Sequence, residues 1–331
     1  KELQKEYTQR VFPELLESLR RDTTCGVFLV MANDQPIGAP GDFTGFFLRD
    51  SDPVTKVDTN SDLLLERGDK TLARQWGITL DNSWSPAFRF QGKGIRESDD
   101  FFYEPYTAGM AHTGVDMASL GYWSMPFILE DYEMDNHKMI TYSVPLVNDG
   151  VIYGVVGTEV SVSYLCNTYF RVQDLNRQQT AGYAIAVDNG DGTYENIAGK
   201  GNLYDAVQRE NGIFKLESTK HEDLFKVKDS KIGSQEIYAL FSKMNLYANN
   251  VPYKNTNWVL CGFVAEDSIF SLGDKLYSDI LTTIVACAVL GLVIMSVVIR
   301  CVTRPVYRLM DSIRSGIAGL KEFAPSGIQE V

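Results

Sequence analysis

The feature that most constrains the fold is a run of twenty residues without a charge, Ile280–Ile299. A helix needs about 20 apolar residues to cross the ~30 Å hydrocarbon core of a bilayer. Such a helix also satisfies its own backbone hydrogen bonds in lipid. We therefore predict a transmembrane helix over 280–299. The alternative is a buried helix of a soluble protein, but uncharged runs of this length are rare there.

The charges beside this run give it an orientation. The residues after it hold five Lys and Arg against three Asp and Glu, a net charge of +2. Because the whole chain carries −12, residues 1–299 carry −14. Short segments rich in Lys and Arg stay on the cytoplasmic side. We expect residues 300–331 to be cytoplasmic and residues 1–279 to lie outside the cytoplasm.

Composition restricts the region before the run. With 11% aromatic and 22% charged residues in the chain, we expect this region to be globular, as one large or two smaller domains. The acidic balance argues against a nucleic-acid partner. Three cysteines outside the run, Cys25, Cys166 and Cys261, are far apart and form no CxxC motif. We expect them to be buried thiols, although one pair could be oxidised.

We also expect the sequence to be part of a longer protein. It begins with Lys1 and shows no signal peptide, so an upstream transmembrane segment would have exported residues 1–279. It stops at Val331, within the segment that we place in the cytoplasm. We expect an effector domain to follow that residue.

The N-terminal segment Lys1–Arg21 is predicted to be a helix. Its apolar residues recur at a four-residue step, which gives one stripe: Leu3, Tyr7, Val11, Leu15 and Leu19. Pro13 could bend the helix. Two interpretations stay open. The stripe is either a stalk or dimer seam, or the face of an ordinary amphipathic helix that packs on its own domain.

The next part reads as an α+β module. The predicted strands are Cys25–Ala32, Gly45–Leu48, Ser83–Phe90, Gly121–Ile128, Lys138–Val147 and Val151–Val160. Asn60–Trp76 and part of Ser98–His112 are predicted to be helical. The turn Asn148-Asp149-Gly150 contains an Asp-Gly pair, which strongly favours a hairpin between the last two strands.

A second, shorter module follows. Ser161–Thr180 is predicted to be a linking helix. The predicted strands are Gly182–Val187, Glu236–Lys243 and Asn257–Ala265, with a hairpin turn at 189–192. Glu266–Asp279 is predicted to be a helix that runs into the apolar span. The chain thus reads as two α+β units in tandem before one transmembrane helix.

Several segments, in this order and spacing, resemble the extracytoplasmic double Cache sensor region of bacterial transmembrane receptors. They are Ser98–Tyr106, Trp123–Phe127, Thr141–Leu146, Val155–Leu165 and Trp258–Phe270. The resemblance covers the whole chain. It implies two PAS-like modules, each an antiparallel sheet with flanking helices, and a ligand in the membrane-distal one. The expected divisions are 1–22 (stalk helix), 23–165 (membrane-distal module), 166–279 (linker helix and membrane-proximal module), 280–299 (transmembrane helix) and 300–331 (cytoplasmic segment).

The tail after the span has a heptad-like pattern of apolar residues, which is typical of a helix that pairs in parallel with a second copy. The pattern consists of Val302, Val306, Leu309, Ile313, Ile317 and Leu320. Arg304-Pro305-Val306 with Leu309 resembles the start of a HAMP domain, here truncated. A plain signalling helix is the alternative.

The resemblance also implies where a ligand would bind. Amino-acid binders of this family share an Arg-x-Trp-Tyr motif, whose arginine holds the ligand carboxylate, and a later Asp that takes the ammonium. The matching stretch here is Asp99–Tyr103, with an aspartate in place of the arginine, and Glu159 replaces the later Asp. An aromatic and acidic set remains: Trp84, Asp100, Phe102, Trp123, Asp131, Tyr142 and Glu159. Such a set suits an amine, a quaternary ammonium or a sugar-like solute.

Catalysis has little support in the sequence. It contains no GxSxG, P-loop or HExxH motif, and His221-Glu222 lacks the second histidine of a zinc site. We expect no catalytic residue, metal or cofactor in this region. The leading hypothesis is a small-molecule receptor of the bacterial cell membrane, a parallel homodimer whose output is a histidine kinase, a diguanylate cyclase or a chemotaxis module. The alternatives are a membrane-anchored extracellular hydrolase and a passive adhesion module.

Overall fold

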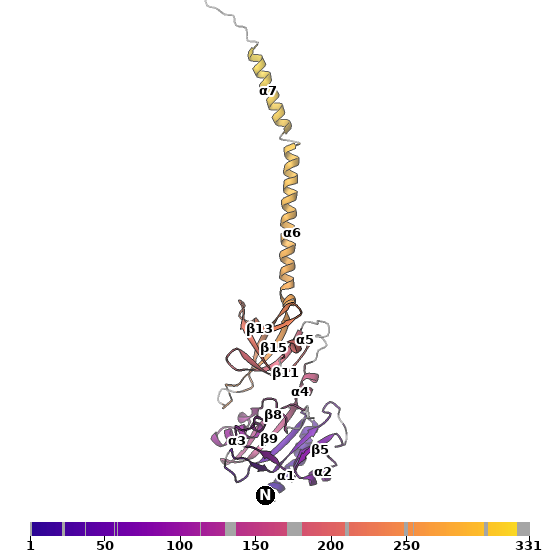
Figure 1. Cartoon of the computed structure of the whole chain (residues 1–331), viewed down its shortest axis with the longest axis vertical. Helices are drawn as coiled ribbons and strands as arrows, with labels where there is room; N and C mark the ends of the chain where they lie inside the picture. Colours follow the sequence, from indigo (N-terminus) through magenta and orange to yellow (C-terminus); the bar gives the residue numbers. More distant parts are fainter. Residues whose placement is uncertain are drawn as a thin grey trace, which may run out of the picture. The chain divides into compact units, whose positions relative to one another are not determined.

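A computed structural model gives the fold. It describes residues 2–21, 24–36, 38–55, 57, 59–112, 114–129, 137–170, 181–208, 212–247, 251–253, 255–300 and 304–322. The chain divides into two compact units, Lys1–Glu266 and Asp267–Val331. The first unit contains a seven-stranded sheet followed by a closed barrel, and the second contains helices (Figure 1).

The sheet of the N-terminal module has the strand order β5-β4-β3-β1-β9-β8-β7. The strands are β1 (Gly26–Met31), β3 (Gly45–Asp50), β4 (Leu63–Arg67), β5 (Thr79–Ser85), β7 (Tyr122–Trp123), β8 (Met139–Asn148) and β9 (Val151–Ser161). A separate ribbon pairs β2 (Gly41–Phe43) with β6 (Phe88–Phe90). The predicted hairpin between β8 and β9 is confirmed, with left-handed backbone at Asp149 (φ 50°) and Gly150 (φ 75°). The sheet departs from the antiparallel expectation at one pair, because β4 and β5 are parallel.

Helix α1 (Glu2–Arg21) packs on β1 and β3 on one side of this sheet (Figure 1). The predicted helix is confirmed, but the predicted stripe is wrong at its N-terminal end. Leu3 is 79% exposed and Tyr7 is 43% exposed. The buried face instead consists of Thr8, Phe12, Leu16 and Leu19. Phe12 fixes this rotation, because its ring meets that of Phe46 on β3 edge-on at 4.8 Å.

Helix α3 (Asp100–Ala111) packs on β8 and β9, with a second hydrophobic cluster beneath it. A 3-10 turn, η1 (Glu97–Asp99), leads into it, and another, η2 (Met117–Leu120), follows it. Alternation along β1 sends Val27 and Leu29 into the cluster under α1, and Phe28 and Val30 into the cluster under α3. The sheet is therefore covered on both faces, as the all-buried strands β1 and β3 require.

Three local predictions for this module are corrected. Asn60–Trp76 contains β4 and the short helix α2 (Lys70–Trp76), because Gly68-Asp69 ends the strand and caps the helix. Ser83–Phe90 is divided between β5 and β6, which belong to different sheets. Gly121–Ile128 pairs with β8 at β7, at a backbone hydrogen bond from Ser124 to Thr141 and at a single bridge between Phe127 and Met139. Pro126, which has no N–H to donate, interrupts the ladder between the last two.

The second module is a closed six-stranded barrel. Its strand pairs are antiparallel, as expected, but the closure of the sheet was not predicted. Its strands are β10 (Ala181–Asp188), β11 (Thr193–Lys200), β12 (Ile213–Ser218), β13 (Phe225–Ile232), β14 (Gln235–Met244) and β15 (Asn257–Ala265). Closure follows because β15 pairs with β10 along one side and with β14 along the other. Helix α5 (Asn202–Val207) packs on β10 and β13. The predicted linking helix is α4 (Val162–Thr168), and residues 171–180 lie outside the described residues.

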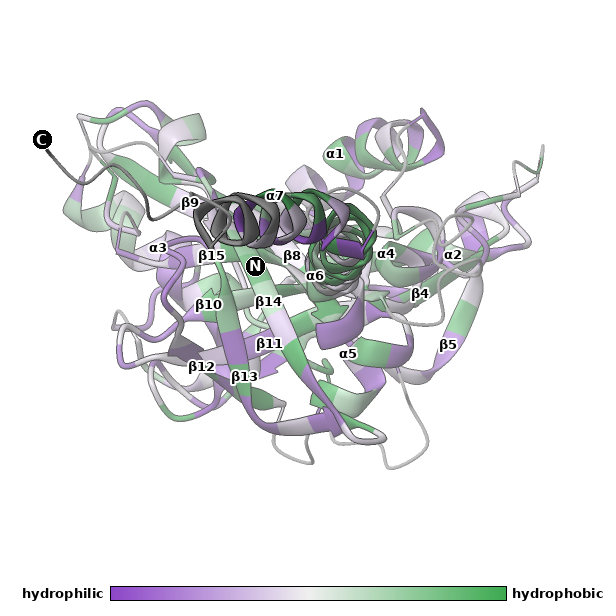
Figure 2. Cartoon of the chain, turned by 90° about the horizontal axis from the view of Figure 1, so that it is seen from above, coloured by the Kyte–Doolittle hydropathy of each residue, from purple (hydrophilic) through white to green (hydrophobic). Residues whose placement is uncertain are grey.

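The second unit is helical. Helix α6 (Glu266–Val298) begins directly after β15, and its apolar segment Lys275–Val298 is exposed along its length. Among the described residues, one helix is long and apolar enough to cross a membrane, and that helix is α6. Helix α7 (Arg304–Glu322) follows. Figure 2 colours most of α6 as hydrophobic and shows mixed hydropathy in α7.

Candidate functional site

The structure distributes the predicted site residues over several places. Trp84 belongs to the cluster under α1, whereas Phe102 belongs to the cluster under α3. These two residues therefore do not line one pocket. Trp123 and Tyr142, on the paired strands β7 and β8, do meet, with ring centroids 5.0 Å apart. Asp131 lies outside the described residues.

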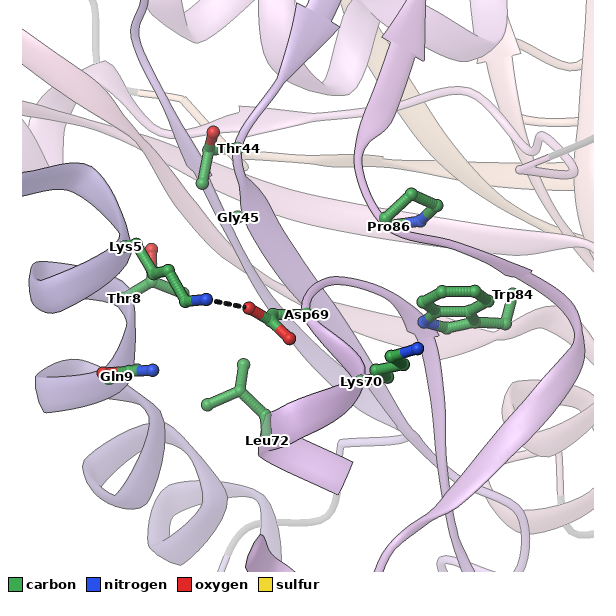
Figure 3. A pocket seen from close by; sticks show the side chains of 10 residues that line it. All are labelled: Lys5, Thr8, Gln9, Thr44, Gly45, Asp69, Lys70, Leu72, Trp84 and Pro86. Atoms are coloured by element: carbon green, nitrogen blue, oxygen red, sulfur yellow. Dashed lines mark ion pairs between the residues drawn. The ribbon is translucent and has the colours of Figure 1, made fainter. Parts of the chain in front are cut away.

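Trp84 lines a cavity of about 470 Å³ between α1, the start of β3 and the start of α2 (Figure 3). The lining residues are Lys5, Thr8, Gln9, Thr44, Gly45, Asp69, Lys70, Leu72, Trp84 and Pro86. Trp84 is oriented by its indole N–H, which donates to the carbonyl of Gly68 at 3.0 Å. The charged groups here are two ammonium groups and one carboxylate, so the cavity does not carry the negative charge that a cation would require.

Asp69 is the central polar group of this cavity. Figure 3 shows the ammonium of Lys5 reaching Asp69, and the two groups are 2.6 Å apart. Asp69 is also the N-cap of α2 and accepts a hydrogen bond from the backbone N–H of Thr71 at 2.9 Å. The hydrogen bond from Lys5, followed by that from Thr71, lowers the pKa of Asp69 to about 2.

We expect Asp69→Ala to lower the free energy of unfolding by about 1–2 kcal/mol, because the variant loses both the cap and the ion pair. Asp69→Asn keeps a capping oxygen and should lose less than ~1 kcal/mol. The depressed pKa of Asp69 stabilises the fold above its ordinary value of 3.8, and this contribution is lost as the pH falls toward about 2. Urea unfolding at pH 7 and pH 3 checks both points. Equal losses for the two variants would show that Asp69 is not acting as a cap.

Glu159 lies in a buried charge network. Its Oε2 is 3.3 Å from Nε of Arg49, and the same guanidinium approaches Glu66 at 2.6 Å. The side chains of Arg49, Glu66 and Glu159 are 7%, 2% and 1% exposed. The Glu66 contact is Coulombic, because its Oε1 is not aligned for a hydrogen bond. Burial raises the pKa of Glu66 to about 8, which Arg49 opposes and Glu159 reinforces.

Gly26 shows how closely the sheet encloses Glu159. The two residues are partners across β1 and β9. A Cβ added at Gly26 would lie within 2.4 Å of Oε2 of Glu159 and 3.0 Å from the carbonyl of Leu48. The carboxylate of Glu159 therefore occupies the space that a side chain at Gly26 would take, and the guanidinium of Arg49 pairs with it.

Phe102 is fully buried in an aromatic core. Its ring stacks on Phe90 with centroids 4.9 Å apart, and Phe43 and Tyr106 lie at 4.9 and 5.1 Å. Phe101, one residue earlier on α3, contacts Phe28 in the same cluster. These rings fill the space between α3 and the sheet, so the role of Phe102 in this structure is packing.

A group of aromatic residues joins the N-terminal module to the barrel. The hydroxyl of Tyr247 accepts a hydrogen bond from the backbone N–H of Trp123 at 3.0 Å. The ring of Tyr253 lies 5.0 Å from Tyr122 and 5.6 Å from Tyr247. Trp258 on β15 lies 6.4 Å from Trp123. We call the rings of Tyr122, Trp123, Tyr142, Tyr247, Tyr253 and Trp258 the aromatic junction.

Asp100 begins α3 close to this junction. Its pKa is raised to about 6, chiefly by burial and then by the carboxylates of Glu104, Glu97 and Asp99, against the opposing effect of Lys93. Burial also raises the pKa of Tyr122, followed by the carboxylates of Asp100 and Glu104. Aromatic and acidic residues therefore lie close together here, and Asp100, Trp123 and Tyr142 of the predicted set are among them.

Sequence reasoning missed Arg49 and Glu66, and three tyrosines of the junction, Tyr122, Tyr247 and Tyr253. Glu104 had a usable signal, because Asp100, Glu104 and Ala108 follow a four-residue step on a predicted helix. Tyr247 and Tyr253 had none, since their partners Tyr122 and Trp123 are more than 120 residues away in the chain.

Comparisons with known proteins give a distant likeness. No family model and no curated protein matches the sequence. The fold is similar to a solved structure of methyl-accepting chemotaxis protein X (12% identity, TM-score 0.41, covering 77% of this chain and 80% of that one). It is also similar to the ligand-binding domain of the Pseudomonas aeruginosa PAO1 amino acid chemoreceptor PctB in complex with L-Arg (14%, TM-score 0.37, 81% and 78%). A third similar structure is the ligand-binding domain of the Campylobacter jejuni chemoreceptor Tlp3 in complex with L-norvaline (12%, TM-score 0.33, 79% and 73%). Other matches are extracellular domains of proteins described as histidine kinases.

Proposed function

We propose that this chain is the sensing and membrane-spanning part of a transmembrane receptor. The observation that carries the proposal is the direct passage from β15 into α6. Strand β15 is hydrogen-bonded on both sides within the barrel, and no residue separates its last residue, Ala265, from the helix that contains the apolar span. A helix joined in this way to a strand of a closed barrel is constrained at its start and can follow a displacement of that strand.

Two further observations support the proposal. The first residue of α6 is tied to the barrel, since the backbone N–H of Glu236 on β14 donates to Glu266 at 3.3 Å. In α7, Val306, Leu309 and Ile313 of the predicted seam are each more than half exposed, as expected for a helix whose partner is a second copy. The side chains of Ile317 and Leu320, together with Val302, lie outside the described residues.

The proposed receptor is a parallel homodimer of the bacterial cell membrane, with residues 1–279 outside and residues 300–331, in a HAMP-like segment, inside. Its ligand is a small amine, a quaternary ammonium or a sugar-like solute, recognised by aromatic and acidic residues of the N-terminal module. The effector would be a histidine kinase, a diguanylate cyclase or a chemotaxis module. The region itself is proposed to bind and not to catalyse.

A thermal-shift screen of the whole chain in lipid nanodiscs tests the ligand class. We expect at least one amine, quaternary ammonium or sugar to raise the unfolding temperature. Ligand at 100 times Kd adds ~2.7 kcal/mol, a shift of roughly 5–10 °C for a domain of this size. Plain amino acids should give no shift, because the arginine that would hold their carboxylate is replaced by an aspartate. A shift with amino acids alone would contradict the proposed ligand class.

A further inference from the structure

The N-terminal half of α3 presents one acidic face to the barrel module. Asp100, Glu104 and Ala108 follow a four-residue step, so their side chains lie above one another on the helix. Ala108 packs in one cluster with Tyr253, Tyr122 and Tyr247. The stripe formed by Asp100 and Glu104 therefore faces the tyrosines of the aromatic junction.

The negative charge on this stripe is not balanced. Four carboxylates gather around the start of α3, those of Glu97, Asp99, Asp100 and Glu104. Glu104 pairs with Lys93 at 3.2 Å, and Asp99 accepts the backbone N–H of Gln91 at 2.8 Å. Within the described part of the chain, Asp100 has neither an ion pair nor a hydrogen-bond partner. A half-buried carboxylate of this kind attracts a cation.

A second observation points independently to a ligand. Tyr253 is only 8% exposed, and its hydroxyl is buried without a hydrogen-bond partner among the described residues. Burial raises the pKa of Tyr253, and the carboxylate of Glu104 raises it further. Tyr253 packs in one cluster with Ala108, which follows Glu104 by one turn of α3, so the ring that carries the unpaired hydroxyl lies beside the acidic stripe. Buried hydroxyl groups are normally paired, so an unpaired one marks a place where a further polar group fits.

We propose that a compact organic ammonium ion binds between the Asp100–Glu104 stripe of α3 and the rings of Tyr122 and Tyr253. Carboxylates pair with its charge, and the faces of the tyrosines attract it. The side chain of Glu104 is 32% exposed, so this end of the stripe is accessible from solvent. The site rests on the proposed sensing function and adds to it the ligand class and a contribution from the barrel module.

This position gives the ligand a way to act on the membrane helix. Tyr122 and the stripe belong to the N-terminal module, whereas Tyr253 belongs to the segment that joins β14 to β15. An occupied site favours the arrangement in which the two modules are held together. Because β15 continues into α6, a shift of that arrangement acts on the strand from which the membrane helix begins.

Isothermal titration of the whole chain in nanodiscs, with n-butylammonium and tetramethylammonium chloride as probes, tests the site. Asp100→Asn should weaken the binding of both probes by about tenfold or more, because the variant loses a charge at the site. Asp149→Asn, at the exposed β8–β9 turn, removes the same charge elsewhere and should leave both affinities unchanged. Equal affinities for Asp100→Asn and the native chain would overturn the site.

The hydroxyl of Tyr253 gives a sharper test. Tyr253→Phe keeps the ring, so tetramethylammonium, which has no N–H, should bind as before. Butylammonium should bind several-fold more weakly, because its N–H loses an acceptor. Tyr183→Phe, on the exposed side of β10, is the matched control. Equal losses for both probes, or none for either, would contradict contact with this hydroxyl.

The pH adds an independent readout. Because the pKa of Asp100 is about 6, the affinity for both probes should be full at pH 7.5 and should fall as the pH is lowered through 6. The charged and titratable groups that face Asp100 are Glu97, Asp99, Glu104, Lys93 and Tyr122. A carboxylate among them that gained a proton would also lose negative charge, so none of them reverses the expected fall in affinity at low pH.

Failure of both probes to bind the native chain overturns this site. The receptor proposal survives that result if a sugar or another amine shifts the unfolding temperature in the screen described above.

Discussion

Replacing Arg49 by Met is expected to destabilise the N-terminal unit by roughly 3–5 kcal/mol at pH 7.5, because it leaves the buried carboxyl groups of Glu66 and Glu159 without the cation that they share. Glu66 and Glu159 are 2% and 1% exposed and approach the Arg49 guanidinium at 2.6 and 3.3 Å. Methionine fills a similar volume, so the loss would come from charge and not from a cavity. Urea unfolding of the whole chain in detergent measures the change.

The matched control is Arg89→Met. Arg89 also pairs with a carboxylate across two strands, Asp42 at 3.4 Å, but the two side chains are 83% and 65% exposed. Exposed pairs of this kind contribute about 0–1 kcal/mol. If Arg49→Met were as mild as Arg89→Met, the buried network would not hold β3, β4 and β9 together.

The pH dependence of Arg49→Met gives the same test a second readout. Without the guanidinium, the pKa of Glu66, already raised by burial, should rise further. A carboxyl whose pKa is higher in the folded state stabilises the fold as the pH falls. We therefore expect the deficit of the variant to grow as the pH rises from 7 to 9, because Glu66 beside Arg49 ionises near pH 8 and Glu66 without Arg49 ionises only at higher pH. A deficit that stays constant from pH 7 to pH 9 would contradict the assignment of the loss to the charge of Glu66.

The elements that the sequence predicted well have local causes. The span in α6 follows from twenty uncharged residues, and the β8–β9 hairpin follows from Asp149-Gly150, whose backbone is left-handed as such a turn requires. Helix α1 was predicted from its period, but its buried face was not. Phe12 and Leu16 are buried because of rings and side chains on β1 and β3, which the helix sequence does not reveal.

The features that the sequence did not predict depend on distant contacts. Barrel closure requires β10 to pair with β15, about 70 residues later, and no local pattern indicates that pairing. In 60–76 a helical period was predicted where Leu63 and Leu65 alternate in a strand, and Gly68-Asp69 then starts a new helix. The Arg49 network likewise joins the consecutive strands β3 and β4 to β9, whose Glu159 follows Arg49 by 110 residues.

The predicted site residues came from the family resemblance and from residue type. The resemblance placed Asp100 and Glu159 where amino-acid binders have an Arg and an Asp, and Glu159 already has a cation partner in Arg49. Trp123 and Tyr142 lie at the aromatic junction, whereas Phe102 is core. Residue type alone does not distinguish a carboxylate that is paired from one that is not.

Two-sided labelling of intact cells tests most directly whether a folded sensor and the α7 helix lie on opposite sides of one membrane. Asp149→Cys places a thiol at the exposed β8–β9 turn, and Ser312→Cys places one on the exposed surface of α7. The native chain, whose Cys25 and Cys261 are buried, gives the background. A membrane-impermeant maleimide should label Asp149→Cys in intact cells, and Ser312→Cys only after lysis. Labelling of Ser312→Cys in intact cells, or protection of Asp149→Cys until lysis, would contradict the receptor topology.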